Sequence, residues 1–112
     1  MAKELYVTTQ ANLAQAHLKL ARYDQAIQCC SLALAVDPGH VKSLFRRASA
    51  RLLDPSANDD VTAIETDLNR VVELAPEEKG AVEQKRAELA ELRRRHDARQ
   101  KALFSRMMGG GA

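Results

Sequence analysis

An internal repeat is the feature of this sequence that most restricts its fold. The segment ANLAQAHLKL (11–20) aligns with FRRASARLLD (45–54) at an offset of 34 residues. Identical residues coincide in this alignment, for example Ala14 with Ala48 and Leu18 with Leu52. A repeat period of about 20–50 residues is typical of solenoids, in which each unit buries its apolar face against its neighbours.

The end of the repeat unit also recurs, at a longer offset. The segment SLALAVDPGH (31–40) aligns with NRVVELAPEE (69–78) at an offset of 38 residues, with Pro38 over Pro76. The offset therefore grows by four residues between the two alignments. We expect the additional residues in 54–60, a stretch of Asp, Pro, Ser, Ala and Asn that is typical of a turn.

The residue types predict helices on both sides of each turn. Ala, Leu, Glu, Arg, Lys and Gln are frequent, and all of them favour helices. Aromatic residues make up only 4% of the chain and Trp is absent, so the core must consist of aliphatic side chains. We therefore predict an all-α chain. The expected helices are Glu4–Leu20, Gln25–Val36, Val41–Leu53, Asp60–Leu74 and Glu77–Met108.

A helix–turn–helix unit of 34 residues, with small residues inside and proline at its end, is the signature of the tetratricopeptide repeat (TPR). In the first unit Ala14, Ala26 and Pro38 fall where this pattern expects small residues and proline. In the second unit Arg47 replaces the first-helix Leu, and Ile64 replaces the second-helix Ala. The predicted architecture is a TPR solenoid with repeats at about 4–38 and 41–76, a C-terminal capping helix at 77–108 and a flexible tail at 109–112.

The N-terminal end of the predicted solenoid has no counterpart of the long capping helix. We expect Leu5 and Val7 in the first helix to pack on structure further upstream, so that this chain is a piece of a larger domain. An uncovered apolar face at that end would favour a dimer of the chain.

Charge is distributed unevenly along the chain, although the formal net charge is only +2. Residues 41–53 hold four basic and no acidic residues, 54–78 hold one basic and eight acidic, and 79–112 hold nine basic and four acidic. Local clusters therefore say more about partners than the overall balance does. Few aromatic residues interleave with the basic ones, so we expect neither a nucleic-acid nor a membrane partner.

The cysteines and the N-terminus predict a cytoplasmic location. Cys29 and Cys30 are adjacent in an expected helix and cannot pair with each other, and free thiols suit a reducing compartment. The N-terminal MAKELYV is unlike a secretory signal. No apolar run approaches the roughly 18 residues that a membrane-spanning helix needs.

Three hydrogen-bond donors are expected to meet in one groove, because the first helices of successive TPR repeats line a concave surface. Asn12 and Arg46 occupy the same repeat position, and Lys42 lies one turn before Arg46. Like charges at this i, i+4 spacing cost roughly 0.2–0.5 kcal/mol, which a bound anion would relieve. An amide, an ammonium and a guanidinium together suit a carboxylate. The expected peripheral groove residues are Gln15, Lys19 and Ser49.

The alternative interpretation is that these basic residues form only a solvated helix face. The matched repeat position of Asn12 and Arg46 favours the groove. Arg47 and Arg51 lie on another side of the same helix, and we expect them to pair with acidic residues in 54–67.

The segments NLAQAHLKL, AIQCCSLALAVDP, VKSLFRRASA and RQKALFSRMM together resemble the C-terminal TPR region of the large immunophilins. These are the FK506-binding type and the TPR-bearing cyclophilins. The resemblance implies a co-chaperone whose groove holds the Glu-Glu-Val-Asp C-terminus of a heat-shock protein 90 or 70 type chaperone in a carboxylate clamp. By position it assigns the clamp to Asn12, Lys42 and Arg46, with Lys19 as a further groove residue. It also implies that the first clamp repeat and the prolyl isomerase domain of the family are absent from this chain.

Catalysis is not expected of this chain. It has no glycine-rich phosphate loop, no Ser-His-Asp pattern and no metal-ligand spacing among its histidines and cysteines. Cys30 and His17 fall at repeat positions that pack in the core, so we predict neither a metal nor a cofactor.

The last predicted helix offers a second functional interpretation. Residues 92–108 are basic and carry spaced apolar side chains, a pattern that calmodulin targets share and that the resemblance also implies. The candidate calmodulin-binding residues are Leu92, Arg95, Leu103, Phe104 and Met107. A solvated extension of the capping helix explains the same pattern, and a general TPR assembly scaffold remains a third interpretation.

Overall fold

The computed structural model of the chain describes residues 2–56 and 60–109. Within these ranges the chain forms helices and no strand, which confirms the all-α prediction. The elements are α1 (Ala2–Lys19), α2 (Tyr23–Val36), α3 (Val41–Leu53), α4 (Val61–Leu74), a 3-10 turn η1 (Pro76–Glu78) and α5 (Lys79–Met107). Part of the expected additional turn residues, 57–59, and most of the expected flexible tail, 110–112, lie outside the described residues.

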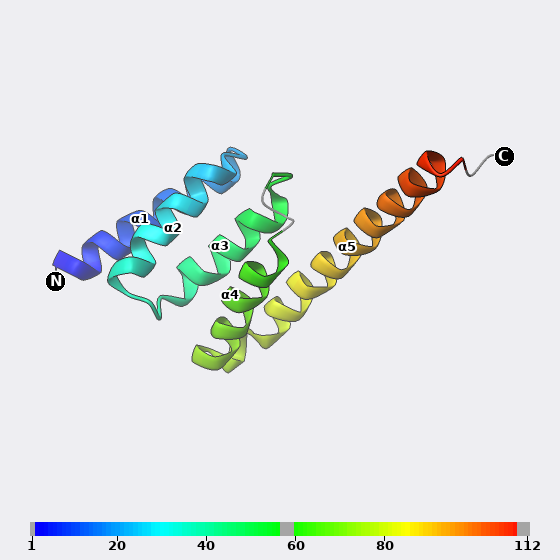
Figure 1. The fold of residues 1–112 in the computed structure, drawn as a ribbon. Coiled ribbons are helices and arrows are strands. Elements are labelled where there is room, and N and C mark those ends of the chain that lie inside the picture. The colour runs from blue at the N-terminus through cyan, green and yellow to red at the C-terminus, as the bar shows by residue number, and fades with distance from the viewer. Residues whose placement is uncertain (1, 57–59, 110–112) are drawn as a thin grey trace.

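The helices stack in chain order as antiparallel neighbours (Figure 1). Helix α1 packs on α2, α2 on α3, α3 on α4, and α4 on α5. Contacts also join α1 to α3 and α3 to α5, so the first helices of successive hairpins lie side by side. The molecule is elongated, 67 × 27 × 20 Å, because α5 continues past the other helices (Figure 1).

The turn between α1 and α2 is shorter than the sequence suggested. We expected α2 to begin at Gln25, but it begins at Tyr23, where Asp24 in the first turn favours the positive end of the helix dipole. Ala21 adopts a left-handed φ of 56°, and the Arg22 N–H donates to the His17 carbonyl at 2.8 Å. This is the bond of a Schellman-type helix end, which lets the chain reverse within three residues.

Two different kinds of side chain fill the core. The first hairpin closes on alanines, of which Ala14, Ala26 and Ala33 have no exposed surface. Later elements bury larger side chains completely, among them Ile64 of α4 and Val82 of α5. The core prediction for Cys30 agrees with the structure, in which its side chain is fully buried and burial raises the pKa of its thiol to about 12.

The first apolar residues of α1 differ from the expectation. Val7 is only 4% exposed, so this chain itself covers a side chain that we expected to need structure upstream. Helix α1 packs on α2, and Val7 lines the same hollow as Val36 at the end of α2. Leu5 is 69% exposed, and of the two residues only Leu5 presents an uncovered apolar surface.

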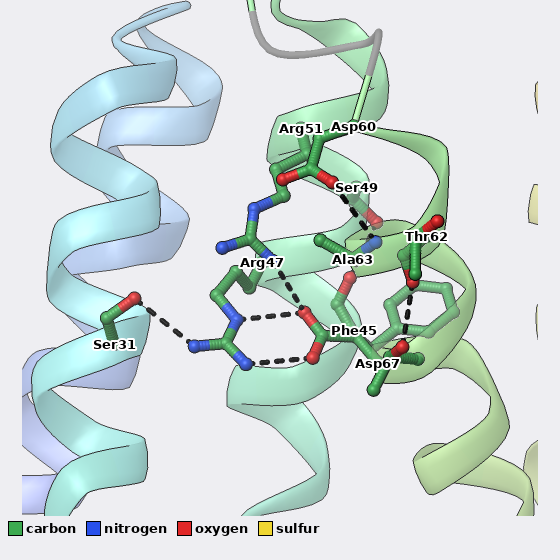
Figure 2. A network of polar contacts seen from close by, with 10 residues as sticks. Ser31, Phe45, Arg47, Ser49, Arg51, Asp60, Thr62, Ala63 and Asp67 are labelled. Carbon is green, nitrogen blue, oxygen red and sulfur yellow. Dashed lines mark hydrogen bonds and ion pairs between the residues drawn. The ribbon is translucent and has the colours of Figure 1, made fainter.

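A polar network around a buried carboxylate joins three helices, and it includes Arg47, which stands where the TPR pattern expects a leucine (Figure 2). Both oxygens of Asp67 on α4 accept hydrogen bonds from Arg47 on α3, each at 2.8 Å. Arg51 reaches the same carboxylate at 3.3 Å, and Arg47 also donates to the Ser31 hydroxyl on α2 at 3.3 Å. The hydrogen bond to Asp67 raises the pKa of Arg47. The prediction that Arg47 and Arg51 pair with an acid in 54–67 is confirmed.

Helix α5 has a docked half and an overhanging half. Val82 and Leu89 are buried against the bundle, and Leu92 is half-buried beside them. Arg86 donates to Asn69 on α4, which fixes the docked half further. From residue 93 to 109 every residue is exposed. The overhang is therefore held by its own helical hydrogen bonds and by ion pairs within α5.

Candidate functional site

One hydrogen bond organises the surface shared by α1 and α3. Nη1 of Arg46 donates to the carbonyl oxygen of Ala11 at 2.7 Å, across 35 positions of sequence. Ala11 directly precedes Asn12, so the half-buried guanidinium of Arg46 is held against the α1 backbone next to Asn12. Arginine carries five N–H donors, so a single bond leaves donor capacity for a ligand.

Lys42 adds a second positive charge on the same side of α3. It is exposed and lies one helical turn before Arg46, in the first turn of a helix that has no acidic residue there. The unpaired N–H groups of a helix start favour anions, and Lys42 therefore reinforces the positive end of α3. Asn12 is also exposed. The three predicted clamp residues thus come from two helices that touch, with Arg46 as the link between them.

The three peripheral residues are placed differently from one another. Gln15 is half-buried and Lys19 is exposed in the last turn of α1, both on the helix that carries Asn12. Ser49 is only 7% exposed, and its hydroxyl donates to the Phe45 carbonyl one turn earlier at 2.9 Å. Serine in a helix commonly bonds the carbonyl at i−4 in this way. The hydroxyl of Ser49 is therefore satisfied within its own helix, and little of this side chain is exposed to a ligand.

A hollow that the sequence did not reveal extends this surface. It has a volume of about 350 Å³ and lies between the first half of α1 and the turn that leads from α2 into α3. Val7 and Val36 line its apolar side, and Thr8 and His40 contribute polar atoms. Thr8 lies one turn before Asn12, and His40 lies two residues before Lys42. The sequence signal that could have found it is the continuation of the groove face of α1 by one turn.

The hollow and the basic cluster differ in charge. Glu4 and Asp37 line the hollow together with Lys3, so its lining holds more acidic than basic residues. The positive potential is concentrated at Lys42 and Arg46. An extended ligand would therefore place its anionic group at Lys42 and Arg46 and an apolar side chain in the hollow.

The candidate calmodulin-binding residues separate into two groups. Leu103, Phe104 and Met107 lie on the overhang and are 48%, 65% and 76% exposed. Leu92 instead packs half-buried on the hydrophobic core, and Arg95 pairs with Glu91 at 3.4 Å. Leu103, Phe104 and Met107 are therefore exposed on the overhang, whereas Leu92 packs against the hydrophobic core.

The histidines and cysteines do not gather. Among residues 2–56 and 60–109, no three His, Cys, Asp or Glu side chains lie close enough together to hold a metal ion. His17 is half-buried in α1, and its Nδ1 is buried without a hydrogen-bond partner in the described part of the chain. In the same ranges no helix is both long and apolar enough to cross a lipid bilayer.

The stacked hairpins and the groove between their first helices define a TPR module. Residues 7–40 match the tetratricopeptide-repeat family. These residues therefore carry a tetratricopeptide repeat, and the chain is similar to the repeat region of FK506-binding-type immunophilins, which confirms the resemblance inferred from its sequence.

The relatives match between 59% and 95% of this chain. The human peptidyl-prolyl cis-trans isomerase FKBP4 is 37% identical over 106 residues, which cover 95% of this chain and 22% of that protein. FK506-binding protein 59 of Drosophila melanogaster is 35% identical over 82 residues, which cover 73% of this chain and 18% of that protein. Sperm-associated antigen 1 of Mus musculus is 38% identical over 66 residues, which cover 59% of this chain and 7% of that protein. The chain thus spans about a fifth of the length of its FK506-binding relatives.

Proposed function

We propose that this module binds the acidic C-terminal Glu-Glu-Val-Asp peptide of a heat-shock protein 90 type chaperone, and that it serves as the docking part of a co-chaperone. The TPR assignment establishes a protein–protein interaction module. The observation that carries the finer proposal is the hydrogen bond from Arg46 to Ala11, which holds a guanidinium beside Asn12 at the junction of α1 and α3.

The geometry supports a carboxylate clamp in which each residue acts differently. Arg46 supplies charge-assisted hydrogen bonds from a fixed position, and Asn12 supplies a neutral donor. Lys42 adds a mobile ammonium that contributes charge without fixed geometry. The hollow lined by Val7 and Val36 accommodates the apolar residue of the peptide. Micromolar affinity, about −8 kcal/mol, is the expected scale for such a short peptide, and added salt should weaken it.

We propose that the parent protein also contains an isomerase domain, as the name of its relative FKBP4 indicates. Human FKBP4 is a peptidyl-prolyl cis-trans isomerase by name, whereas this chain matches its repeat region and carries no catalytic constellation in its sequence. We propose that the module positions such an isomerase domain near a chaperone in the cytoplasm. The chain itself acts by binding and not by catalysis.

Isothermal titration calorimetry with the peptide Met-Glu-Glu-Val-Asp tests the clamp. The variant Lys42→Ala/Arg46→Ala should lose at least tenfold in affinity. Lys101→Ala/Arg106→Ala is the matched control, because it removes the same two charges from the exposed end of α5 and should stay within twofold of the parent chain. The same peptide with an amidated C-terminus should bind the unmodified chain as weakly as the free-acid peptide binds Lys42→Ala/Arg46→Ala. Unchanged binding by Lys42→Ala/Arg46→Ala contradicts the proposal.

A second candidate function is calmodulin binding by the overhang of α5. Its support is the exposure of Leu103, Phe104 and Met107 on the basic overhang of α5, in which every described residue is exposed. The chain should then be retained on immobilised calmodulin only with calcium, and Phe104→Ala/Met107→Ala should abolish retention. Absence of retention by the unmodified chain removes this candidate.

Two further interpretations, a general TPR scaffold and a dimer, make different predictions. A general TPR scaffold would bind through apolar groove positions, so that Val36→Ser weakens partner binding and Lys42→Ala/Arg46→Ala does not. A dimer through the N-terminal end would depend on the exposed side chains of Leu5 and Tyr6. Sedimentation of the chain and of Leu5→Ser should then differ, and a strict monomer at high concentration contradicts the dimer.

A further inference from the structure

A second groove lies at the opposite end of α3 from the clamp residues. It has a volume of about 630 Å³, within the range of about 300–1,000 Å³ that is usual for ligand sites. It lies where α5 passes the turn between α3 and α4, at the base of the overhang seen in Figure 1. Lys42 lies in the first turn of α3, and Pro55 follows the end of α3. At 1.5 Å per residue, the two surfaces are about 18 Å apart along the helix.

Helical spacing explains which residues of α5 face this groove. Leu92, His96 and Arg99 are i, i+4 and i+7, so they form one stripe along the helix. Arg95 and Arg93 lie to either side of this stripe, and these five residues line the groove together with Asp97, which lies about 140° from Leu92 around the helix. Arg94 and Lys101 point to the opposite side of α5, about 180–200° away at 100° per residue.

The groove carries an excess of positive charge. Its lining includes three arginines, Arg93, Arg95 and Arg99, and one carboxylate, Asp97. Arg95 is already paired with Glu91 at 3.4 Å. The side chains of Arg93 and Arg99 make no hydrogen bond or ion pair with another described residue. Two guanidinium groups therefore remain available to an anionic ligand on the walls of one groove.

The groove also has an apolar floor, which selects among anions. Val61 at the start of α4 and Leu92 of α5 are half-buried and pack on the main hydrophobic cluster, so the floor is held by the core. Pro55 adds an exposed ring with a fixed backbone. A polyphosphate or a nucleic-acid backbone has nothing to place on such a floor. A peptide with acidic residues beside an apolar side chain matches both the floor and the walls.

We propose that the groove formed by Pro55, Val61 and the 92–99 segment of α5 is a second peptide site, which binds an acidic internal segment with an apolar anchor residue. The apolar side chain rests on Val61 and Leu92, and the flanking carboxylates bind Arg93 and Arg99. An internal segment suffices, because the site does not require a terminal carboxylate. The proposal is independent of the clamp at Asn12, Lys42 and Arg46.

Fluorescence polarisation with the complete 112-residue chain tests this site. The probe is a fluorescein-labelled peptide Glu-Asp-Leu-Glu-Asp-Leu-Glu whose C-terminus is amidated, so that it cannot use a clamp for a terminal carboxylate. Arg93→Glu/Arg99→Glu should weaken binding at least tenfold, whereas Lys42→Ala/Arg46→Ala should change it less than twofold. A probe with Ser in place of both Leu residues should bind at least fivefold more weakly than the original.

The matched control is Arg94→Glu/Lys101→Glu, which makes the same charge change on the opposite side of α5. It should weaken binding less than threefold. Circular dichroism melts of both variants show whether they fold, and Arg93→Gln/Arg99→Gln, expected to lose at least threefold, replaces the glutamate variant if that one does not. The proposal is overturned if the control loses as much as Arg93→Glu/Arg99→Glu, if the Ser probe binds equally, or if inorganic polyphosphate displaces the probe at equal affinity.

Discussion

The carboxylate of Asp67 offers the sharpest test of how this fold is held together. Its side chain is 4% exposed and accepts hydrogen bonds from Arg47 and Arg51, whose side chains are 21% and 20% exposed. Asp67→Asn preserves the shape of the side chain but removes the charge that both arginines face. It also replaces one acceptor oxygen by a donor NH2 group, which cannot pair with a guanidinium.

The expected loss follows from the burial of this network. Breaking a buried ion pair by changing one partner costs about 3–5 kcal/mol. The two arginines retain about a fifth of their surface in water, and asparagine still accepts one hydrogen bond, so we expect a loss of about 2–3 kcal/mol. For a chain of this size, that corresponds to a fall in Tm of about 10 °C. Urea unfolding followed by circular dichroism measures the free energy directly.

A control and a rescue make the Asp67 prediction specific. Glu65→Gln removes an exposed carboxylate from the same helix, and it should change stability by less than about 0.5 kcal/mol. The double variant Arg47→Leu/Asp67→Leu replaces the ion pair by apolar side chains and should recover at least half of the loss, because buried pairs are often no better than a hydrophobic replacement. A loss below about 0.5 kcal/mol for Asp67→Asn would refute the reasoning.

Three further predictions concern stability. The pKa of the Cys30 thiol is raised above its ordinary value of 9.0 to about 12, so its contribution to the free energy of unfolding is fully present below pH 9 and is lost as pH rises toward 12. Urea titrations at pH 10 should therefore show a loss of about 1 kcal/mol, which the variant Cys30→Ala should not show. Hydrogen bonds from Ser56 lower the pKa of Asp54, so this carboxylate stabilises the fold above about pH 4 and loses that contribution as pH falls further. In urea titrations, Ser56→Ala should therefore cost about 0.5–1.5 kcal/mol at pH 7 and much less near pH 2. Deleting 98–112 should leave Tm within about 2 °C in a calorimetric scan, because the described part of that segment is exposed, and a larger fall would show that the overhang packs on the bundle.

The sequence predicted the helices well because helix stops and apolar spacing are local properties. Pro38 and Pro76 mark where α2 and α4 end, and the bounds of α3 agree with the prediction. The start of α2 was placed two residues late, since the reversal depends on a left-handed Ala21 that no residue type signals. The pairing of Arg47 with an acid was predictable from charge, but Asp67 as the shared partner required the register between α3 and α4.

The candidate site was predictable only as far as the repeat position defines it. Repeat arithmetic placed Asn12 and Arg46 together, and the structure adds the bond from Arg46 to the Ala11 carbonyl. It could not show that Ser49 would satisfy its hydroxyl within its own helix. The groove beside Arg93 and Arg99 depends on how α5 crosses the α3–α4 turn, which is a tertiary property that helical spacing alone does not contain.

The hydrogen bond between Arg46 and Ala11 has a consequence for folding cooperativity. In an elongated stack of hairpins, stability is the sum of each unit and of the interfaces between neighbouring units. This bond crosses such an interface, since Ala11 belongs to the first hairpin and Arg46 to the second. A peptide bound there would act as a cross-link between hairpins and would add its binding free energy to their interface. Binding should then slow amide hydrogen exchange in α1 and α3 together, so that the two hairpins unfold as a single unit.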